Sequence, residues 1–182
     1  STLRHDITAV TDMLGSADRL RFMSIQNVMT HEVFCVKATD RVVDAWLSLM
    51  EKNISGAPVV DCEGLLVGVL SVTDIYRAVL DRVRKAKSLR EATCQMVDKD
   101  AEEKDTLREL TLSMRAVAES KVSSLLPMRQ ELLTLGPNDS LDRALKIIAE
   151  HNVNRLPVVK DGKVVGIITR ADIIEVFSGK RR

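Results

Sequence analysis

The hydrophobic and polar positions of the chain follow one order that occurs twice. In the first half, a short apolar stretch (33–36) precedes a segment with apolar residues at helical spacing (42–50). Two runs rich in branched residues (57–60 and 65–70) flank a Gly-containing turn, a pattern typical of a β-hairpin. A second helical pattern starts after Ser71. The order predicted is therefore strand, helix, strand, strand, helix.

The second half shows the same pattern. Apolar stretches at 132–135, 156–159 and 164–168 predict strands, and the spacing over 141–148 predicts a helix. The last helix is expected after Thr169. In both halves the first helix follows polar residues, Thr39-Asp40 or Asn138-Asp139-Ser140, that are expected to act as its N-cap.

The two halves also match residue by residue. Segment 28–60 aligns without a gap on 127–159, so that Met29 falls on Met128 and Pro58 on Pro157. After a shift of one residue in the hairpin turn, Asp74 falls on Asp172. Two copies of one small fold are the natural interpretation, because one copy alone buries little apolar surface. We call them repeat 1 and repeat 2.

Two segments lie outside the repeats. The predicted divisions are a helical N-terminal segment at 1–27, repeat 1 at 28–80, a charged helical insert at 81–124, repeat 2 at 125–178 and a basic C-terminal end at 179–182. In the first segment Ile7, Val10, Met13 and Leu14 share a helical face, and in the insert Leu107, Leu110, Met114 and Val117 recur at helical spacing. The insert is predicted to be either a helical pair packed on the repeats or an arm that docks a partner.

Composition narrows the class of protein. Hydrophobic residues make up 45% and charged residues 29% of 182 residues, and the net charge is +1, an ordinary balance for a globular protein. Without a basic excess, and with 3% aromatic residues, neither nucleic acid nor a membrane surface is an expected partner. The three cysteines are predicted to be buried free thiols, since their number and spacing fit neither a disulfide scaffold nor zinc. An intracellular, cytoplasmic protein is expected, or an organellar one if a transit peptide was removed.

Two sequence stretches per repeat carry a resemblance to a known family. They are Ile-Ser-Gly-Ala-Pro-Val-Val (54–60) with Gly-Val-Leu-Ser-Val-Thr-Asp (68–74), and Val-Asn-Arg-Leu-Pro-Val-Val (153–159) with Gly-Ile-Ile-Thr-Arg-Ala-Asp (166–172). Each set resembles a CBS repeat, and together they resemble the paired-CBS, or Bateman, module over roughly residues 25 to 178. With its long insert the chain is also similar to the small single-pair CBS proteins of plants.

The resemblance implies an α/β (α+β) fold in which tandem CBS repeats pack as a pseudo-two-fold pair. It implies ligand clefts between the repeats and a homodimer formed through the CBS helices. The exposed helix faces that carry Trp46 and Ile75 are the predicted dimer surfaces.

The motifs Ser71-x-x-Asp74 and Thr169-x-x-Asp172 suggest what such a cleft binds. Each stands where a strand ends and a helix begins, and the free amides and dipole of a helix N-terminus favour a phosphate. An ionised Asp in the first turn accepts hydrogen bonds from ribose hydroxyls, and Thr73 adds a hydroxyl in repeat 1. The alternative is that both motifs are only helix caps.

The two repeats differ in charge before their Pro-Val-Val stretches. Repeat 2 has Arg155, which suits a phosphate, although it is equally a candidate for a surface ion pair. Repeat 1 has the uncharged Ser55 and Gly56 there. The difference favours one charged site near Arg155 and one site that is empty or holds a less charged adenosyl compound. The predicted ligand-binding residues are Ser71, Thr73, Asp74, Ile54, Pro58, Arg155, Val153, Pro157, Thr169, Arg170 and Asp172.

The resemblance implies a regulatory function. The chain is expected to bind AMP, ADP, ATP or S-adenosylmethionine, and thereby to modulate its own assembly or an unknown partner protein, as an energy sensor does. No enzyme activity, catalytic residue, metal or other cofactor is predicted, because no nucleophile motif or metal-ligand pattern occurs. The alternatives are a ligand-free dimerisation scaffold and the regulatory part of a larger enzyme or transporter.

Overall fold

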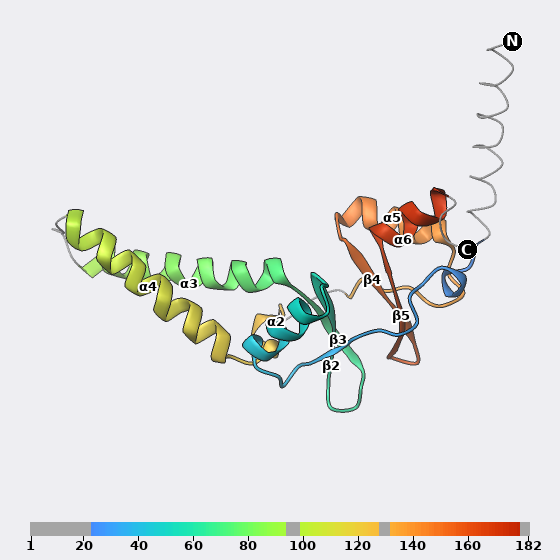
Figure 1. Cartoon of the computed structure of the whole chain (residues 1–182), viewed down its shortest axis with the longest axis horizontal. Helices are drawn as coiled ribbons and strands as arrows, with labels where there is room; N and C mark the ends of the chain where they lie inside the picture. Colours follow the sequence, from blue (N-terminus) through green and yellow to red (C-terminus); the bar gives the residue numbers. More distant parts are fainter. Residues whose placement is uncertain (1–22, 94–98, 128–131, 179–182) are drawn as a thin grey trace, which may run out of the picture. The chain divides into compact units, whose positions relative to one another are not determined.

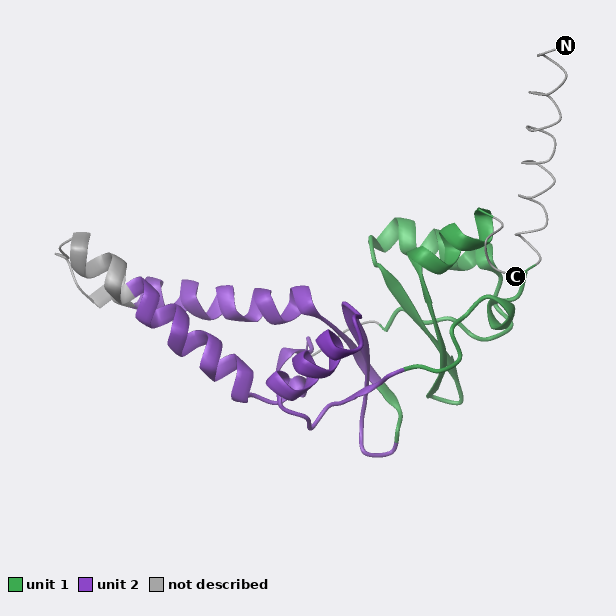
Figure 2. Cartoon of the chain, in the orientation of Figure 1, with its two compact units in different colours: residues 1–33, 64–66, 131–182 green, residues 34–63, 67–130 purple. Residues whose placement is uncertain are grey.

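The computed structural model describes residues 23–93, 99–127 and 132–178. The expected helix around Ile7 to Leu14, the basic C-terminal end and Cys94 lie outside these residues. The chain divides into two compact units, coloured separately in Figure 2. Unit 1 comprises residues 1–33, 64–66 and 131–182, and unit 2 comprises residues 34–63 and 67–130. Most of repeat 2 thus lies in unit 1, and most of repeat 1 lies in unit 2.

Repeat 1 has the predicted order of elements (Figure 1). Strands β1 (Val36–Lys37), β2 (Gly56–Val60) and β3 (Leu66–Ser71) form one sheet in that order, with β1 parallel to β2. Helix α2 (Val42–Glu51) follows β1, and α3 (Val72–Thr93) follows β3. Strand β1 is shorter than the sequence predicts, and it begins where the predicted strand 33–36 ends.

Repeat 2 follows the same order. Helix α5 (Leu141–His151) precedes the antiparallel strands β4 (Arg155–Lys160) and β5 (Lys163–Thr169), and α6 (Arg170–Phe177) comes last. The strand expected at 132–135 is reduced to one parallel bridge between Leu135 and Val158. The two-residue turn between β4 and β5 has positive φ at Asp161 (53°) and at Gly162 (79°), as the Asp-Gly sequence favours for a hairpin of type I′.

The segment before each repeat packs in the unit that holds the other repeat. In unit 1, the amide of Leu141 donates to the carbonyl of Met23 over 3.0 Å, next to the 3-10 turn η1 (Ile25–Asn27). In unit 2, the amide of Val42 donates to the carbonyl of Ser120 over 2.9 Å, next to the turn η2 (Val122–Leu125). Each compact unit is therefore assembled from segments distant in sequence.

Two glycines leave room for these two segments, residues 23–30 and 120–127, which we call the exchanged segments. A side chain on Gly68 of β3 would meet Leu126 Cδ2 at 2.7 Å, and one on Gly166 of β5 would overlap Met29. Met29 and Leu126 are therefore structural equivalents, whereas the ungapped sequence alignment paired Met29 with Met128. The alignment is displaced by two residues at this end of the repeat.

Each unit has its own hydrophobic core, built from branched and aliphatic side chains. The core of unit 1 contains the buried residues Ile25, Val28, Met29, Leu135, Leu141, Ala144, Ile148, Leu156, Val158, Ile168 and Ile173. The core of unit 2 contains the buried residues Val36, Val42, Ala45, Leu49, Ala57, Val59, Leu70, Val117 and Val122. Ile25 and Val122, from the two exchanged segments, have no exposed surface, which explains why these segments stay with their cores.

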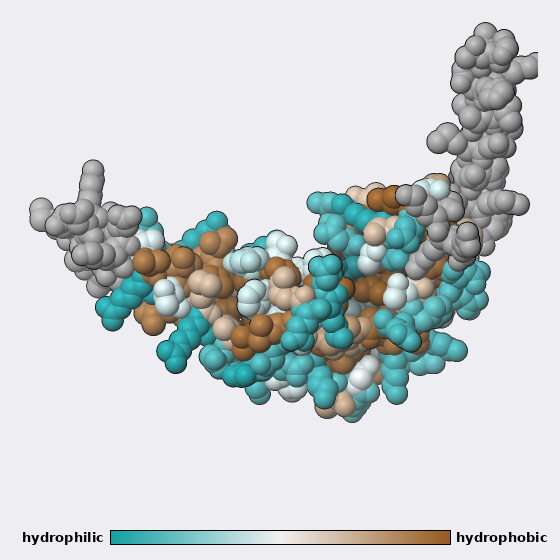
Figure 3. Space-filling view, viewed as in Figure 1, coloured by the Kyte–Doolittle hydropathy of each residue, from teal (hydrophilic) through white to brown (hydrophobic). Residues whose placement is uncertain are grey.

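The insert is a pair of helices that continues from repeat 1. Helix α3 runs through the predicted boundary at 80/81, and α4 (Lys99–Glu119) packs against it and against α2. We call this helical pair the arm; it extends away from the β2–β3 strands of unit 2 (Figure 1). Leu107 and Met114 are 66% and 54% exposed, and Figure 3 shows hydrophobic residues on the surface of the arm. Only Val117 of the predicted apolar set is fully buried among the described residues.

The predicted helix caps form in one repeat only. Ser140 caps α5 by accepting from the amide of Arg143 over 3.3 Å. In repeat 1 the N-cap is Arg41, whose side chain makes no cap bond, so the expected Thr39-Asp40 cap is wrong. Asp40 instead accepts from the amide of Lys37 over 2.9 Å and stabilises the turn before the helix.

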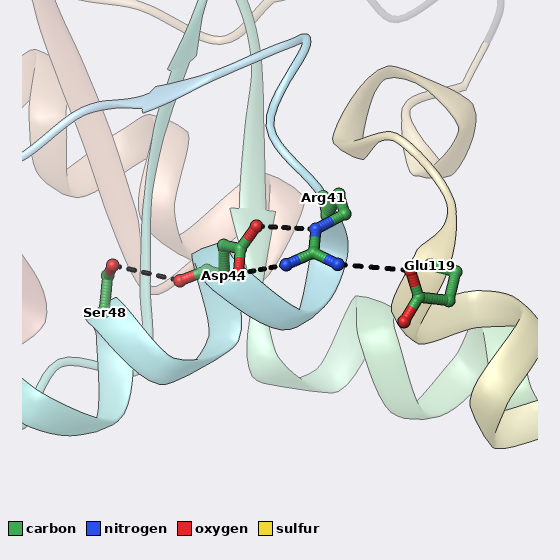
Figure 4. A network of polar contacts seen from close by, with 4 residues as sticks. All are labelled: Arg41, Asp44, Ser48 and Glu119. Atoms are coloured by element: carbon green, nitrogen blue, oxygen red, sulfur yellow. Dashed lines mark hydrogen bonds and ion pairs between the residues drawn. The ribbon is translucent and has the colours of Figure 1, made fainter.

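Arg41 anchors a surface network in place of the missing cap (Figure 4). Its guanidinium donates to both carboxylate oxygens of Asp44, over 2.8 and 3.0 Å, and to Glu119 of α4 over 3.2 Å. The hydrogen bonds and charge of Asp44, and then the hydrogen bond and charge of Glu119, raise the pKa of Arg41 above its ordinary value. The network joins the start of α2 to the end of α4.

The cysteines only partly follow the sequence prediction. Cys35 and Cys62 are free thiols, Cys35 is half-buried and burial raises the pKa of its thiol. Cys62 is exposed, because it lies in the polar turn between β2 and β3, so its predicted burial is wrong. Among the described residues, none of the helices combines the length and apolarity that a bilayer crossing requires.

Candidate functional site

The first predicted site lies where β3 passes into α3. The amide of Ser71 donates to Asp74 Oδ2 over 2.9 Å, and the Ser71 hydroxyl donates to the same oxygen over 2.5 Å. The amide of Asp74 donates back to the hydroxyl over 3.3 Å. The other oxygen of Asp74 forms an ion pair with Arg77 over 3.2 Å. The motif therefore fixes the carboxylate at the first turn of the helix.

The second predicted site repeats this geometry between β5 and α6. The amide and hydroxyl of Thr169 both donate to Asp172 Oδ2 over 2.8 Å, and the Asp172 amide returns a bond of 3.3 Å. The pair is a complete capping box. The capping interpretation of both motifs is thus realised in the structure. A ligand would share these carboxylates with the caps.

Arg155 lies beside the second motif. It is the first residue of β4, and in the β4–β5 ladder it stands directly opposite Thr169. Residues paired in this way project from the same face of a sheet, so the half-buried arginine and the threonine share one face. The structure therefore brings together the cation and the hydroxyl that the sequence analysis assigned to one phosphate site.

Arg170 has a structural task in the same region. Its Nε donates to the carbonyl of Val153 over 3.0 Å, and its Nη2 donates to Asn152 Oδ1 over 2.8 Å. Asn152 ends α5 in the left-handed conformation, so Arg170 ties that helix end to the start of α6. Its predicted ligand role stays a prediction.

The apolar members of the predicted set lie in or against the cores. Pro58 and Pro157 are buried within β2 and β4. Ile54 and Val153 are half-buried and pack against the cores of unit 2 and unit 1. These four side chains contribute to core packing, while Thr73 is exposed on the first turn of α3.

A pocket adjoins the first motif, and the sequence analysis missed most of it. It has a volume of about 410 Å³, in the range of small-molecule sites, and lies within unit 2. We call it the α3 pocket. Asp74, Arg77 and Asp81 line one side along α3. The 74, 77, 81 spacing was visible in the sequence as one helical face, but nothing in the sequence placed residues 124–127 opposite it.

The second motif differs from the first in its charged neighbours. Counting from the hydroxyl residue of each motif, Arg77 corresponds to Glu175, and Val72 corresponds to Arg170. The Asp74–Arg77 pair is exposed by 35% and 66%. No cluster of three or more metal-ligating His, Cys, Asp or Glu side chains occurs in the part of the chain that the structure describes.

Comparison with protein families identifies both repeats. The CBS domain model matches residues 25–81 and 122–179. Each match begins with the short segment that precedes a repeat and packs in the unit that holds the other repeat.

Proteins similar to this chain occur in archaea and plants. Protein MJ1426 of Methanocaldococcus jannaschii is 26% identical over 156 residues, which are 85% of this chain and 91% of that protein. The chloroplastic CBS domain-containing protein CBSX2 of Arabidopsis thaliana is 34% identical over 140 residues, which are 76% of this chain and 56% of that protein. The chain thus spans little more than half the length of the plant relative.

Solved structures share the fold. A crystal structure of CBSX2 in complex with AMP has a TM-score of 0.60 and 26% identity, and the match covers 88% of this chain and 99% of that one. The CBS domain of a membrane protein from Sphaerobacter thermophilus has a TM-score of 0.67 and 24% identity, with 93% and 97% covered. The predicted α+β fold with tandem repeats is confirmed.

Proposed function

The chain belongs to the CBS domain family, and from that premise we propose that it is a regulatory module that binds an adenine nucleotide or another adenosyl ligand, and not an enzyme. One observation carries the proposal. The same hydroxyl–carboxylate arrangement stands at the same strand-to-helix junction in both repeats. A structural relative with 26% identity, CBSX2, is an AMP complex.

The chemistry of the second junction suits a phosphate-bearing ligand. The ribose hydroxyls would donate to Asp172, and a phosphate would lie near Arg155 and the Thr169 hydroxyl. The cap donates two hydrogen bonds to one oxygen of Asp172, and a carboxylate offers about four acceptor sites. A ribose hydroxyl can therefore donate to the same carboxylate while the cap stays formed.

Regulation requires two states that bind the ligand differently. A ligand shifts the balance between two packings only by its differential affinity for them. The proposed outcome is a change in assembly or in affinity for a partner protein of unknown identity. The predicted compartment, the cytoplasm or an organelle, stays a prediction.

The test is a thermal-shift and calorimetric titration with AMP, ADP, ATP and S-adenosylmethionine. A ligand at one hundred times its dissociation constant should stabilise the fold by about 2.7 kcal/mol, and for this chain length each kcal/mol raises the melting temperature by about 2–4 °C. Asp172→Ala and Asp74→Ala should each abolish the shift from the ligand bound at that junction.

Two matched controls separate binding from capping. Asp40 and Asp139 also accept backbone amide bonds at turns, from Lys37 and Gly136 over 2.9 and 2.7 Å. Their alanine variants should lose about 1 kcal/mol of stability, as a lost cap does, and keep the ligand shift. Equal loss of ligand response in all four variants would argue against a site at the junctions.

A ligand-free scaffold is the second candidate. It is favoured by the reciprocal bonds that already satisfy one oxygen of Asp74 and of Asp172. If none of the four compounds shifts the melting temperature, and the alanine variants change only stability, the scaffold replaces the sensor. A third possibility, the regulatory part of a larger enzyme or transporter, is tested by isolating the protein with its partners.

We also propose that the chain self-associates through α2. Trp46, Leu47 and Met50 are 37%, 48% and 52% exposed on this helix, a concentration of apolar surface. The other predicted face needs correction, because Ile75 packs against the core of unit 2 and its neighbour Tyr76 is the exposed residue. Sedimentation velocity should show a dimer that Leu47→Glu dissociates, whereas Leu112→Glu, on the exposed surface of α4, should leave the dimer intact.

A further inference from the structure

The α3 pocket has two unlike walls. Asp74, Arg77 and Asp81 follow one another along a single face of α3, at the spacing that aligns side chains on a helix. Val69, Leu125 and Leu126 supply apolar surface. Such a combination of apolar lining with a few convergent polar groups is typical of small-molecule sites.

The charges in this pocket alternate. A carboxylate comes first, then a guanidinium, then a second carboxylate, and the helical rise spreads the three over about 10 Å. The only cation among the residues that line the pocket stands between two anions. A polyphosphate extending from Asp74 past Arg77 would meet the like charge of Asp81.

A zwitterionic tail, with one negative and one positive group, suits this order of charges. A carboxylate accepts two parallel hydrogen bonds from a guanidinium, and an ammonium donates to a carboxylate. We propose that the α3 pocket binds an adenosyl compound that carries an amino-acid tail, with the ribose at Asp74, the α-carboxylate at Arg77 and the α-ammonium at Asp81. This assignment rests on the proposed function and names the ligand class of one of its two sites.

The present ion pairs do not block this mode of binding. Arg77 pairs with Asp74 over 3.2 Å, and Asp81 pairs with Arg84 over 3.4 Å. The side chains of Arg77 and Arg84 are 66% and 76% exposed, and ion pairs in such settings contribute little and exchange readily. When the ligand carboxylate takes Arg77, the oxygen that Arg77 now occupies on Asp74 becomes available to the ribose.

The charge order belongs to repeat 1 alone. In repeat 2 the position of Arg77 holds Glu175, and the position of Asp81 holds Gly179. A tail carboxylate would be repelled there. The two junctions are therefore predicted to select different ligands, a zwitterionic adenosyl compound in repeat 1 and a phosphate-bearing one beside Arg155 in repeat 2.

The test compares ligands that share the adenosyl group and differ in the tail. Isothermal titration calorimetry uses S-adenosylmethionine, 5′-methylthioadenosine (without the amino-acid tail), AMP and ATP, on the full chain carrying Asp172→Ala to silence repeat 2. S-adenosylmethionine should bind at least about tenfold more tightly than 5′-methylthioadenosine, as expected for two added charge-assisted bonds.

Single variants then assign the ends of the tail. Arg77→Gln and Asp81→Asn should each lower the affinity for S-adenosylmethionine by about tenfold and leave the affinity for 5′-methylthioadenosine unchanged. Arg84→Gln is the matched control, because Arg84 pairs with Asp81 without lining the pocket, and it should leave both affinities unchanged or slightly raised. Melting curves of the three variants check that each is folded.

The outcomes separate this inference from the proposed function. Equal affinity for both adenosyl compounds, unaffected by Arg77→Gln and Asp81→Asn but lost in Asp74→Ala, overturns the tail assignment and leaves the sensor intact. ATP binding more tightly than S-adenosylmethionine, and weakened by Arg77→Gln, also overturns it. If no adenosyl compound binds even the unsubstituted chain, the proposed function fails and the tail assignment fails with it.

Discussion

Repeat 1 and repeat 2 are more alike in the residues that fix their backbone turns than in their surfaces. Asn53 and Asn152 both follow the first helix of their repeat with positive φ, at 52° and 51°. Asp40 and Asp139 both accept from the amide three residues earlier. These features fix turns that each copy needs in order to fold, so both copies retain them.

The surfaces around the two junctions differ. The last helix has 22 residues in repeat 1 and 8 in repeat 2, and only the longer one continues into the arm. Arg77 stands where repeat 2 has Glu175, and Arg155 stands where repeat 1 has Gly56. The comparison teaches that one scaffold can hold two junctions of the same geometry and unlike charge, which is the basis for proposing two ligand preferences.

The largest expected effect tests whether the two cores are equally tight. Leu70 and Ile168 occupy equivalent positions in β3 and β5 and are 1% and 0% exposed. Leu70→Ala and Ile168→Ala should each lower the free energy of unfolding by about 2–5 kcal/mol, because each leaves a cavity in a packed core. Chemical denaturation measures both, with Leu112→Ala at an exposed position as the control. A loss below about 1 kcal/mol in one repeat would show that its core repacks, and the equivalence would fail.

The next effect concerns the exchanged segments. Gly68→Val and Gly166→Val should each cost about 1–3 kcal/mol of folding stability, because the new side chain collides with Leu126 or with Met29. Shortening the partner, as Leu126→Ala or Met29→Ala, should recover part of the loss in a double-mutant cycle. The cost should be larger at Gly166, since Met29 is 7% exposed and Leu126 is only partly buried. An additive loss in only one cycle would mean that the contacts at the two glycines are not equivalent, and additive losses in both would mean that neither new side chain meets the assigned partner.

A smaller effect distinguishes the two asparagines. Glycine adopts positive φ without strain, so Asn53→Gly should be close to neutral. Asn152→Gly also removes the acceptor for Arg170, and it should lower the free energy of unfolding by about 0.5–1.5 kcal/mol. Thermal melts of both variants, of Arg170→Ala and of the Asn152→Gly/Arg170→Ala pair test this, since in the pair Arg170→Ala should cost less than alone because only the bond to the Val153 carbonyl is left to lose. Equal stabilities for the two glycine variants would remove the assigned role of Arg170.

The smallest effect is expected at the start of the first helix. Arg41→Ser removes the ion pairs with Asp44 and Glu119 and supplies a hydroxyl like that of Ser140. The stability gained from the new cap and the stability lost with the ion pairs should nearly cancel at low salt. The stability of the variant should depend less on salt than that of the unsubstituted chain, because screening weakens exposed ion pairs. Melting temperatures at low and high ionic strength check this. An equal salt dependence would show that the Arg41 network adds nothing to stability.

Much of the local structure followed from local chemistry. Helical spacing located α2 and α5 within a few residues, and the Gly-containing turns located both hairpins. The cap of α2 was mispredicted because Asp40 accepts from the amide of Lys37 in the preceding turn, and the helix begins after Arg41 instead. The site prediction named both hydroxyl–carboxylate motifs, and it did not name Arg77 and Asp81, which line a pocket only because residues 124–127 lie opposite them.

The sequence by itself determined the repeat, the order of strands and helices, and the pairing of Ser71 with Asp74 and of Thr169 with Asp172. These depend on contacts within a few residues, which local spacing and side-chain chemistry specify. Only the tertiary structure decided that segment 23–30 packs with repeat 2 and segment 120–127 with repeat 1, and that the latter closes a pocket over α3. Those contacts join residues distant along the chain, and burial of apolar surface selects them without leaving a periodic signature in the sequence.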